Sequence, residues 1–149
     1  MIKFSKDTLE DDRGAIHPIP LDILDRNWNQ CTIATNPKKH TFRGLHYQEP
    51  RQAKYIRVIQ GAVIDFSYSL NGDPSSSEVL LPGQSVYIKE NYAHGYLTLE
   101  PSTIVMYLST EVYSSDQKVI NYKSCNYIKH VIENLTGGEL LMSGKDGNG

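Results

Sequence analysis

The middle of the chain alternates between apolar and polar residues with a period of two. From position 62 to 70 one set of side chains is apolar or aromatic and the other is mostly polar, namely Ala62, Ile64, Phe66, Tyr68 and Leu70 against Val63, Asp65, Ser67 and Ser69. Successive side chains of a strand point to opposite faces, so this pattern predicts a β-strand with two different faces. The preceding segment 55–59 is rich in β-branched residues and ends at Gln60-Gly61, which predicts a second strand joined by a turn.

Three further short segments, 85–89, 95–99 and 103–110, have the composition of strands, and turn-forming residues separate them. Turn signals every eight to twelve residues, without a long helical period, predict an all-β domain that is either a sandwich or a barrel. One short helix is expected over 127–135, where apolar residues recur at helical spacing. The final thirteen residues hold five of the eleven glycines, which predicts that 137–149 is a flexible tail or a lid that orders on ligand binding.

Length and charge narrow the class of protein. The 149 residues suit a single domain, 1–149, and no internal repeat is present. The net charge of -2 and the pI near 6.2 provide no broad attraction for nucleic acid or an anionic membrane. Cys31 and Cys125 lie far apart, which gives no basis for a zinc site or a disulfide framework. Without a signal peptide or a membrane-spanning apolar run, we expect a cytoplasmic protein.

The densest group of chemically active residues lies at 41–48, where Arg43, His46 and Gln48 fall within six positions. On a regular strand His46 and Gln48 point to one face and Arg43 to the other. Joint action of Arg43 and His46 therefore requires a β-bulge, and Gly44 is the residue at which one could form.

Several motifs in the same order resemble the dTDP-4-dehydrorhamnose 3,5-epimerase family of nucleotide-sugar cupins. They are Asp11-Asp12-Arg13-Gly14, then Arg43-Gly44-Leu45-His46-Tyr47-Gln48, then Arg57-Val58 with Gly61-Ala62-Val63-Ile64-Asp65, then Ala93-His94-Gly95-Tyr96, and finally Tyr107 and Tyr113. The resemblance implies a double-stranded β-helix (jelly-roll, cupin) barrel with a short C-terminal helix or tail. It also implies a homodimer in which an arm formed by residues 1–20 exchanges strands between subunits.

The resemblance implies an isomerase that inverts C3, C5 or both in a nucleotide-diphosphate-linked 4-keto-6-deoxy sugar. The carbonyl acidifies the flanking protons, so the reaction needs a base, a group that stabilises the enolate and an acid on the opposite face. By resemblance His46 is the base, Asp146 orients it, Lys54 stabilises the charge on O4 and Tyr107 is the acid. Arg51 and Arg57 remain alternatives to Lys54, because the segment between Gln48 and Lys54 is shorter than in the family.

Substrate-binding residues also follow from the resemblance: Arg13, Arg43, Gln48, His94 and Tyr113. The two arginines are expected to contact the diphosphate, for which a guanidinium is well shaped. Tyr113 is expected to stack on the nucleotide or sugar, and His94 is a second histidine of the pocket. No cofactor is expected, and no metal, since Gln48 stands where many cupins have a second histidine ligand.

Some positions depart from the family pattern. Ile16 and Pro18 occupy the places of an aromatic residue and a glutamate that read thymine, and segments 27–40 and 121–124 also differ. These departures favour a relative that acts on another nucleotide or sugar, or at only one carbon. Two alternatives stay open: a non-catalytic cupin that binds a nucleotide sugar or glycan, and a sugar-nucleotide keto-isomerase. The first would be favoured if Lys54 and Tyr107 pointed away from His46.

Overall fold

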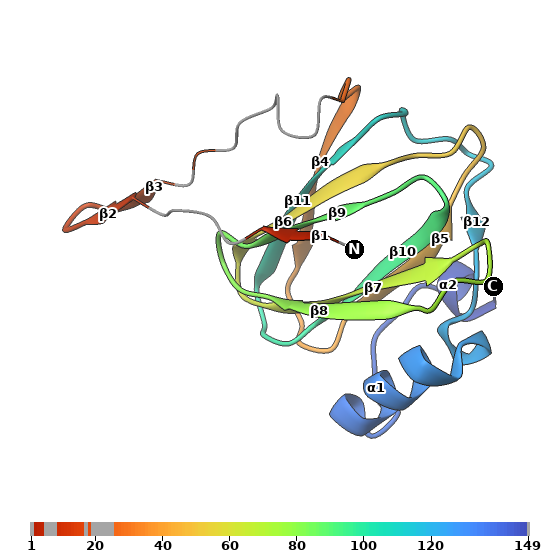
Figure 1. Cartoon of the computed structure of the whole chain (residues 1–149). Coiled ribbons are helices and arrows are strands. Elements are labelled where there is room, and N and C mark those ends of the chain that lie inside the picture. Colours follow the sequence, from red (N-terminus) through yellow and green to blue (C-terminus); the bar gives the residue numbers. More distant parts are fainter. Residues whose placement is uncertain (1, 5–8, 17, 19–25, 149) are drawn as a thin grey trace.

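The computed structural model describes residues 2–4, 9–16, 18 and 26–148, and in this part of the chain two five-stranded antiparallel sheets face each other (Figure 1). The first sheet has the strand order β1 (Ile2–Phe4), β9 (Ser85–Ile88), β6 (Lys54–Gln60), β11 (Thr103–Ser109) and β4 (Gln30–Asn36). The second sheet has the order β12 (Lys118–Val119), β5 (Phe42–Tyr47), β10 (Tyr92–Thr98), β7 (Val63–Ser69) and β8 (Ser76–Leu80). The predicted all-β class is confirmed.

The remaining elements lie outside these two sheets. Strands β2 (Leu9–Asp11) and β3 (Gly14–Ile16) form a separate hairpin, which stands away from the sheets in Figure 1. A 3-10 turn, η2 (Tyr122–Ser124), leads into helix α1 (Asn126–Thr136), and a short helix α2 (Gly144–Asn148) follows. No helix in the described residues is long and apolar enough to cross a membrane.

Apolar side chains form two cores, one on each side of the second sheet. Between the sheets lies a cluster of Ile56, Val58, Val63, Leu80, Val86, Ile88, Tyr96 and Val105. The outer face of the second sheet packs against α1 and η2 through Phe42, Leu45, Ile64, Phe66, Ala93, Leu97, Tyr122, Ile128 and Ile132. The apolar face predicted for segment 62–70 therefore points outward, toward α1. Its polar face points between the sheets, where Asp65 and Ser67 are buried.

Most predicted elements are present, with informative differences. The helix predicted over 127–135 is confirmed as α1, which ends at Gly137 in the left-handed conformation. The strand expected over 95–99 is longer than predicted, because β10 pairs with β7 from Tyr92 onward. Strands β4 and β8 were not predicted. Each lies at an edge of its sheet, and neither has the continuous apolar run by which a strand is recognised in a sequence. In β4 the apolar residue Ile33 is exposed, as is Cys31.

The glycine-rich end has a defined place in the structure. The sequence predicts a flexible tail, or a lid that orders on ligand binding, over 137–149; in the structure residues 144–148 form α2 and Leu141 forms a bridge to Thr41 beside β5. Asp146 in α2 is only 5% exposed. The end of the described chain is therefore packed against the barrel; residue 149 and, in the proposed arm, residues 1, 5–8, 17 and 19–20 lie outside the described residues.

The bulge predicted at Gly44 is confirmed by the strand register. Tyr96 of β10 pairs with Arg43, while His94, two residues earlier, pairs with His46, three residues later. Two residues of β5 therefore oppose Gly95 alone, which is the definition of a bulge. The extra residue turns Arg43 and His46 to the same face, the one between the sheets.

Close packing of two backbones makes glycine necessary at this bulge. Gly44 has a φ of 141°, and a Cβ placed on it would lie 2.5 Å from the Cα of Gly95. A side chain at either position would push β5 and β10 apart.

We expect Gly44→Ala to lower the free energy of unfolding by about 3 kcal/mol, because backbone strain adds to a steric clash. Urea denaturation measures this change. Gly72→Ala is the matched control, since Gly72 also has a positive φ but open space around it; its cost should be only about 1 kcal/mol. Equal losses for the two variants would show that the approach to Gly95 is unimportant.

Candidate active site

A polar cavity lies between the two sheets and brings together residues from distant parts of the sequence. It has a volume of about 140 Å³ and is lined by Arg43, His46, Lys54, His94, Tyr96, Tyr107, Tyr113 and Gln117. A larger cavity of about 400 Å³ shares Arg43, His46, Tyr113 and Gln117 and extends toward α2. Six of the nine site residues predicted from the sequence line the inner cavity.

His46 and Asp146 form a hydrogen-bonded pair on one wall of the cavity. Their side chains are 2.6 Å apart, from Nε2 of the imidazole to Oδ1 of the carboxylate. Since the carboxylate accepts, Nε2 carries the proton and Nδ1 remains available to accept another. The imidazole is partly exposed and the carboxylate is almost fully buried, so the pair can hold a histidine base in a fixed orientation.

The bulge and α2 together hold Asp146 in place. Its second oxygen, Oδ2, accepts a hydrogen bond of 3.1 Å from the backbone N–H of Gly44, and its own N–H donates to the Ser143 hydroxyl. Burial alone would raise the pKa of Asp146, but the hydrogen bonds from His46 and Gly44 and the charge of His46 hold that pKa below its ordinary value. Asp146 therefore remains a carboxylate beside His46.

Lys54 enters the cavity from β6 of the opposite sheet. Its ammonium group lies 5.8 Å from the centre of the Tyr107 ring. Burial lowers the pKa of Lys54 to about 8, while the negative charge of Asp65 acts in the other direction. A buried cation in this cavity can stabilise negative charge on a bound oxygen.

The two alternatives to Lys54 lie elsewhere. Arg51 pairs with Glu49 and lies over the Tyr47 ring. Arg57 is fully buried on the outer face of its sheet, since its neighbours Ile56 and Val58 point between the sheets. Neither arginine lines the cavity.

Asp65 and His94 form a second buried pair in the same region. The carboxylate of Asp65 lies 2.7 Å from Nε2 of His94, and both residues are buried. Burial raises the pKa of Asp65 and lowers the pKa of His94, against the mutual attraction of their charged forms. The other oxygen of Asp65, Oδ1, is buried without a hydrogen-bond partner among the residues that the structure describes. It is therefore available to a neighbouring donor, such as the Lys54 ammonium or a bound hydroxyl.

Tyr107 stands on β11, in the sheet opposite to His46. Burial raises the pKa of its phenol, and a hydrogen bond to Thr32 and the charge of Arg43 only partly offset this effect. The phenol therefore keeps its proton at neutral pH and can act as an acid. An imidazole on one sheet and a protonated phenol on the other thus face the same cavity from opposite sides.

The remaining predicted residues are divided between the cavities and other places. Arg43 and Tyr113 line both cavities. Gln48 lines neither: its buried amide donates to the Val112 carbonyl and accepts from the Ser114 N–H, so it anchors the loop that carries Tyr113. Arg13 lies on the β2–β3 hairpin, paired with Asp11, and lines neither cavity.

Four residues of the site region were missed from the sequence: Asp65, Tyr96, Gln117 and Asn36, which holds Arg43. Asp65 gives one signal, since it is a lone acidic residue within a segment of apolar and hydroxyl side chains, a pattern that fits a buried carboxylate. Gln117 lies in an irregular segment and gives none. Among the described residues, no group of three or more His, Cys, Asp or Glu side chains is placed to hold a metal ion.

Comparison of the sequence with known proteins identifies one family. The family model for dTDP-4-dehydrorhamnose 3,5-epimerase matches residues 3–149. An epimerase of that name from Mycobacterium tuberculosis is 35% identical over an alignment of 104 residues, which covers 64% of this chain and 50% of the relative. The chain thus spans about half the length of the curated relatives it matches.

Solved structures agree on the fold. The dTDP-4-dehydrorhamnose 3,5-epimerase from Bacillus anthracis, solved with TDP and PPi bound, is 25% identical with a TM-score of 0.80, over 97% of this chain and 90% of that one. A 3'-monoepimerase from Streptomyces bikiniensis, solved with dTDP-quinovose, is 20% identical with a TM-score of 0.80, over 98% of this chain and 80% of that one. The predicted cupin fold is confirmed, and the chain belongs to the dTDP-4-dehydrorhamnose 3,5-epimerase family.

Proposed function

We propose that the protein is an epimerase that inverts C3, C5 or both in a nucleotide-linked 4-keto-6-deoxy sugar. The observation that carries the proposal is the placement of His46 on one sheet, with Asp146 of α2 bonded to it, and of Tyr107 and Lys54 on the facing sheet, so that His46, Lys54 and Tyr107 line one cavity. Inversion at carbon requires removal of a proton from one face and delivery to the other, which this arrangement supports.

The proposed reaction begins when Nδ1 of His46 takes the proton from the carbon next to the carbonyl. The electron pair of that C–H bond moves into the ring and onto O4, which becomes an enolate oxygen beside the Lys54 ammonium. Tyr107 then donates its phenolic proton to the same carbon from the opposite face as the enolate returns to a ketone. The product is an isomer, and exchange with solvent returns the proton from His46 to the tyrosinate.

The two cavities suit the two parts of such a substrate. The inner cavity contains the acid and base groups and would hold the sugar, and the larger one would hold the nucleoside. Arg43 lines both cavities, so a diphosphate between sugar and nucleoside would lie beside its guanidinium. Tyr113 lines both as well and would lie against the sugar or nucleoside.

This geometry supports a catalyst over the non-catalytic binding alternative, because Lys54 and Tyr107 line the same cavity as His46. The family's epimerases of dTDP-sugars make thymidine the first nucleotide to test. Uridine, cytidine and guanosine derivatives follow, because Ile16 and Pro18 replace the residues expected to read thymine. The keto-isomerase alternative and the cytoplasmic location stay predictions from the sequence.

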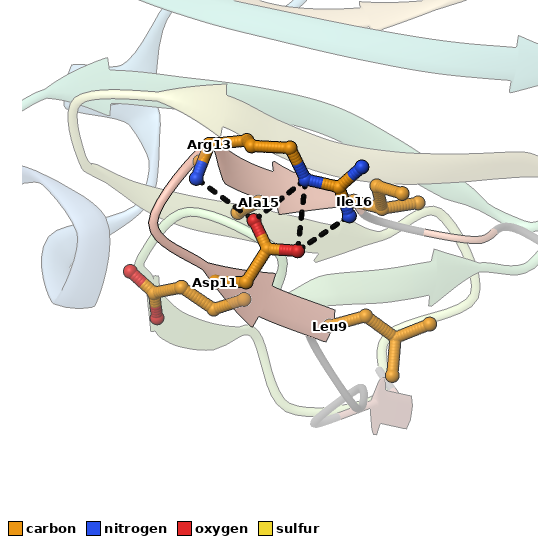
Figure 2. A pocket seen from close by; sticks show the side chains of 7 residues that line it. Leu9, Asp11, Arg13, Ala15 and Ile16 are labelled. Atoms are coloured by element: carbon orange, nitrogen blue, oxygen red, sulfur yellow. Dashed lines mark hydrogen bonds and ion pairs between the residues drawn. The ribbon is translucent and has the colours of Figure 1, made fainter.

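We also propose that two copies of the chain associate through the β2–β3 hairpin. Its paired residues Leu9 and Ile16 are 60% and 62% exposed, and Figure 2 shows both on the hairpin beside the Asp11–Arg13 ion pair. A two-stranded hairpin alone is at best marginally stable in water. Docking on a second copy would cover these apolar side chains and is consistent with the strand exchange that the sequence resemblance implies.

Solvent exchange tests the chemistry directly. With a 4-keto-6-deoxy nucleotide sugar in deuterated water, the wild-type protein should introduce deuterium at C3, C5 or both, as followed by NMR. His46→Ala should reduce the exchange rate by about a hundredfold or more, since it removes the base. His130→Ala is the control, because His130 lies on the exposed side of α1. If the wild-type protein exchanges neither position with any of the four nucleotides, the proposal is wrong.

The pH profile tests the role of Lys54. Its ammonium form predominates below a pKa of about 8 and is lost above it, so kcat/KM should fall as pH rises through about 8. Asp65→Asn removes the charge that raises the pKa of Lys54, so it should move this fall to lower pH. Lys54→Arg stays charged at all working pH values and should abolish the fall. A fall near pH 8 that persists in Lys54→Arg would assign it to another group.

Mass measurement by light scattering tests the hairpin contact. The wild-type protein should have twice the mass of one 16.8 kDa chain. The double variant Leu9→Asp and Ile16→Asp should be monomeric, because it puts charges into the apolar contact. Glu10→Gln, a polar change on the same hairpin, should leave the dimer intact. A monomeric wild-type protein, or a double variant that stays dimeric, would contradict the proposal.

A further inference from the structure

A buried asparagine lies behind the arginine that separates the two cavities. Asn36 is the last residue of β4 and is 1% exposed. Its Oδ1 accepts a 2.8 Å hydrogen bond from Nε of Arg43. Its Nδ2 donates to the Thr103 carbonyl at 3.2 Å and to the Tyr96 hydroxyl at 3.3 Å. Asn36 thus connects an edge strand of one sheet to β5 and β10 of the other.

These bonds fix the direction of the Arg43 guanidinium. Besides the bond from Nε to Asn36, its Nη2 donates to the Thr35 carbonyl at 3.2 Å. Both contacts are made to β4, on one edge of the planar group. The other edge, with Nη1, makes no hydrogen bond to any residue that the structure describes, and the side chain lines both cavities. One edge of the guanidinium is therefore held by β4, and the edge with Nη1 can donate to a ligand.

The chemical type of the holding group matters as much as its position. An amide is a neutral acceptor, so it orients Arg43 without cancelling its positive charge. A carboxylate in the same place would also orient the guanidinium but would form an ion pair with it, and a bound anion would then meet a neutralised site. A buried neutral acceptor suits an arginine whose charge serves a ligand.

The direction of Asn36 is itself fixed. Its Nδ2 faces the Thr103 carbonyl, so Oδ1 is the atom left to face Arg43. The Tyr96 hydroxyl lies 3.3 Å from Nδ2 and 3.4 Å from Oδ1. Burial raises the pKa of Tyr96 to about 12, so this hydroxyl remains protonated and uncharged beside the amide. The Thr103 carbonyl, which can only accept, thus prevents the amide from turning its donor toward the guanidinium, while the Tyr96 hydroxyl can bond either amide atom.

We propose that Asn36 is a positioning residue that presents Arg43 to the diphosphate of the substrate and thereby sets the affinity for it. The inference rests on the proposed function, since it takes a nucleoside diphosphate sugar as the ligand. Asn36 acts through Arg43 and has no part in proton transfer. Its loss therefore weakens binding of the diphosphate and leaves the chemistry at the sugar carbon intact.

The test measures binding separately from turnover. Calorimetry with thymidine, uridine, cytidine and guanosine diphosphates, and with inorganic pyrophosphate, identifies the probe that the wild-type protein binds most tightly. Asn36→Leu removes the acceptor at similar volume and should raise the Kd of that probe and the KM of the nucleotide sugar by about tenfold. Its kcat should change by less than about threefold, since the acid and base groups are unaffected.

Two more variants separate positioning from a loss of folding. Asn36→Asp keeps the acceptor but adds a negative charge, so it should also weaken binding although Arg43 stays held. Ile132→Ala removes buried apolar contacts between α1 and the outer face of the second sheet, and Ile132 lines neither cavity. It should lower the melting temperature without changing the Kd, which shows that instability alone does not impair binding.

A double-mutant cycle with Arg43→Ala decides whether Asn36 acts through Arg43. In the absence of Arg43, Asn36→Leu should cause no further loss of affinity. If the two losses multiply, Asn36 acts independently and the inference is wrong; it is also wrong if Asn36→Leu alone leaves Kd and KM unchanged. If the wild-type protein binds none of the probes, the proposed function fails instead, so the two failures are distinguishable.

Discussion

The close approach of Gly44 to Gly95 is the constraint on which the site depends. It creates the bulge that turns Arg43 and His46 to the same face of β5. A bulge also takes a backbone N–H out of the regular ladder, and here the N–H of Gly44 donates to Asp146 instead. One local irregularity thus points the proposed base into the cavity, adds the proposed diphosphate contact beside it and provides an anchor for the carboxylate that orients the base.

The second general feature is a cavity lined by polar side chains that shares the space between the sheets with an apolar cluster. Lys54, Asp65 and His94 are buried, and burial disfavours the charged form of each. The attraction of Asp65 to Lys54 and His94 acts in the opposite direction. Folding is sustained elsewhere, by the aliphatic cluster between the sheets and by α1 packed on the outer face. Apolar burial in these two clusters stabilises the fold around the cavity, and Tyr96 belongs to both the inner cluster and the cavity lining. The polar face of β7 points inward, where Asp65 pairs with His94.

Much of this could be predicted from the sequence, because periodicity and turn residues report directly on strands. The alternation at 62–70, the helix around Ile128 and Ile132 and the need for a bulge at Gly44 were all visible. The inward direction of Asp65 was not, since alternation defines two faces without saying which one meets the core. Gln48 shows a second limit: the family motif that contains it implies a substrate contact by resemblance, whereas in the structure its amide bonds the Val112 carbonyl and the Ser114 N–H and so holds a loop. Asn36 shows a third limit. Its proposed positioning role depends on contacts with Arg43, Tyr96 and Thr103, which lie on different strands and share no local pattern.

The pair His46–Asp146 joins residues one hundred positions apart, and one member stands on a helix of five residues. So short a helix has little stability of its own and depends on its contacts, among them the hydrogen bond from the Asn121 side chain to the Gly147 carbonyl. Local opening of α2 would disconnect the carboxylate from the imidazole without disturbing either sheet. The fraction of molecules in which Asp146 orients the proposed base then depends on the docking equilibrium of one helical turn.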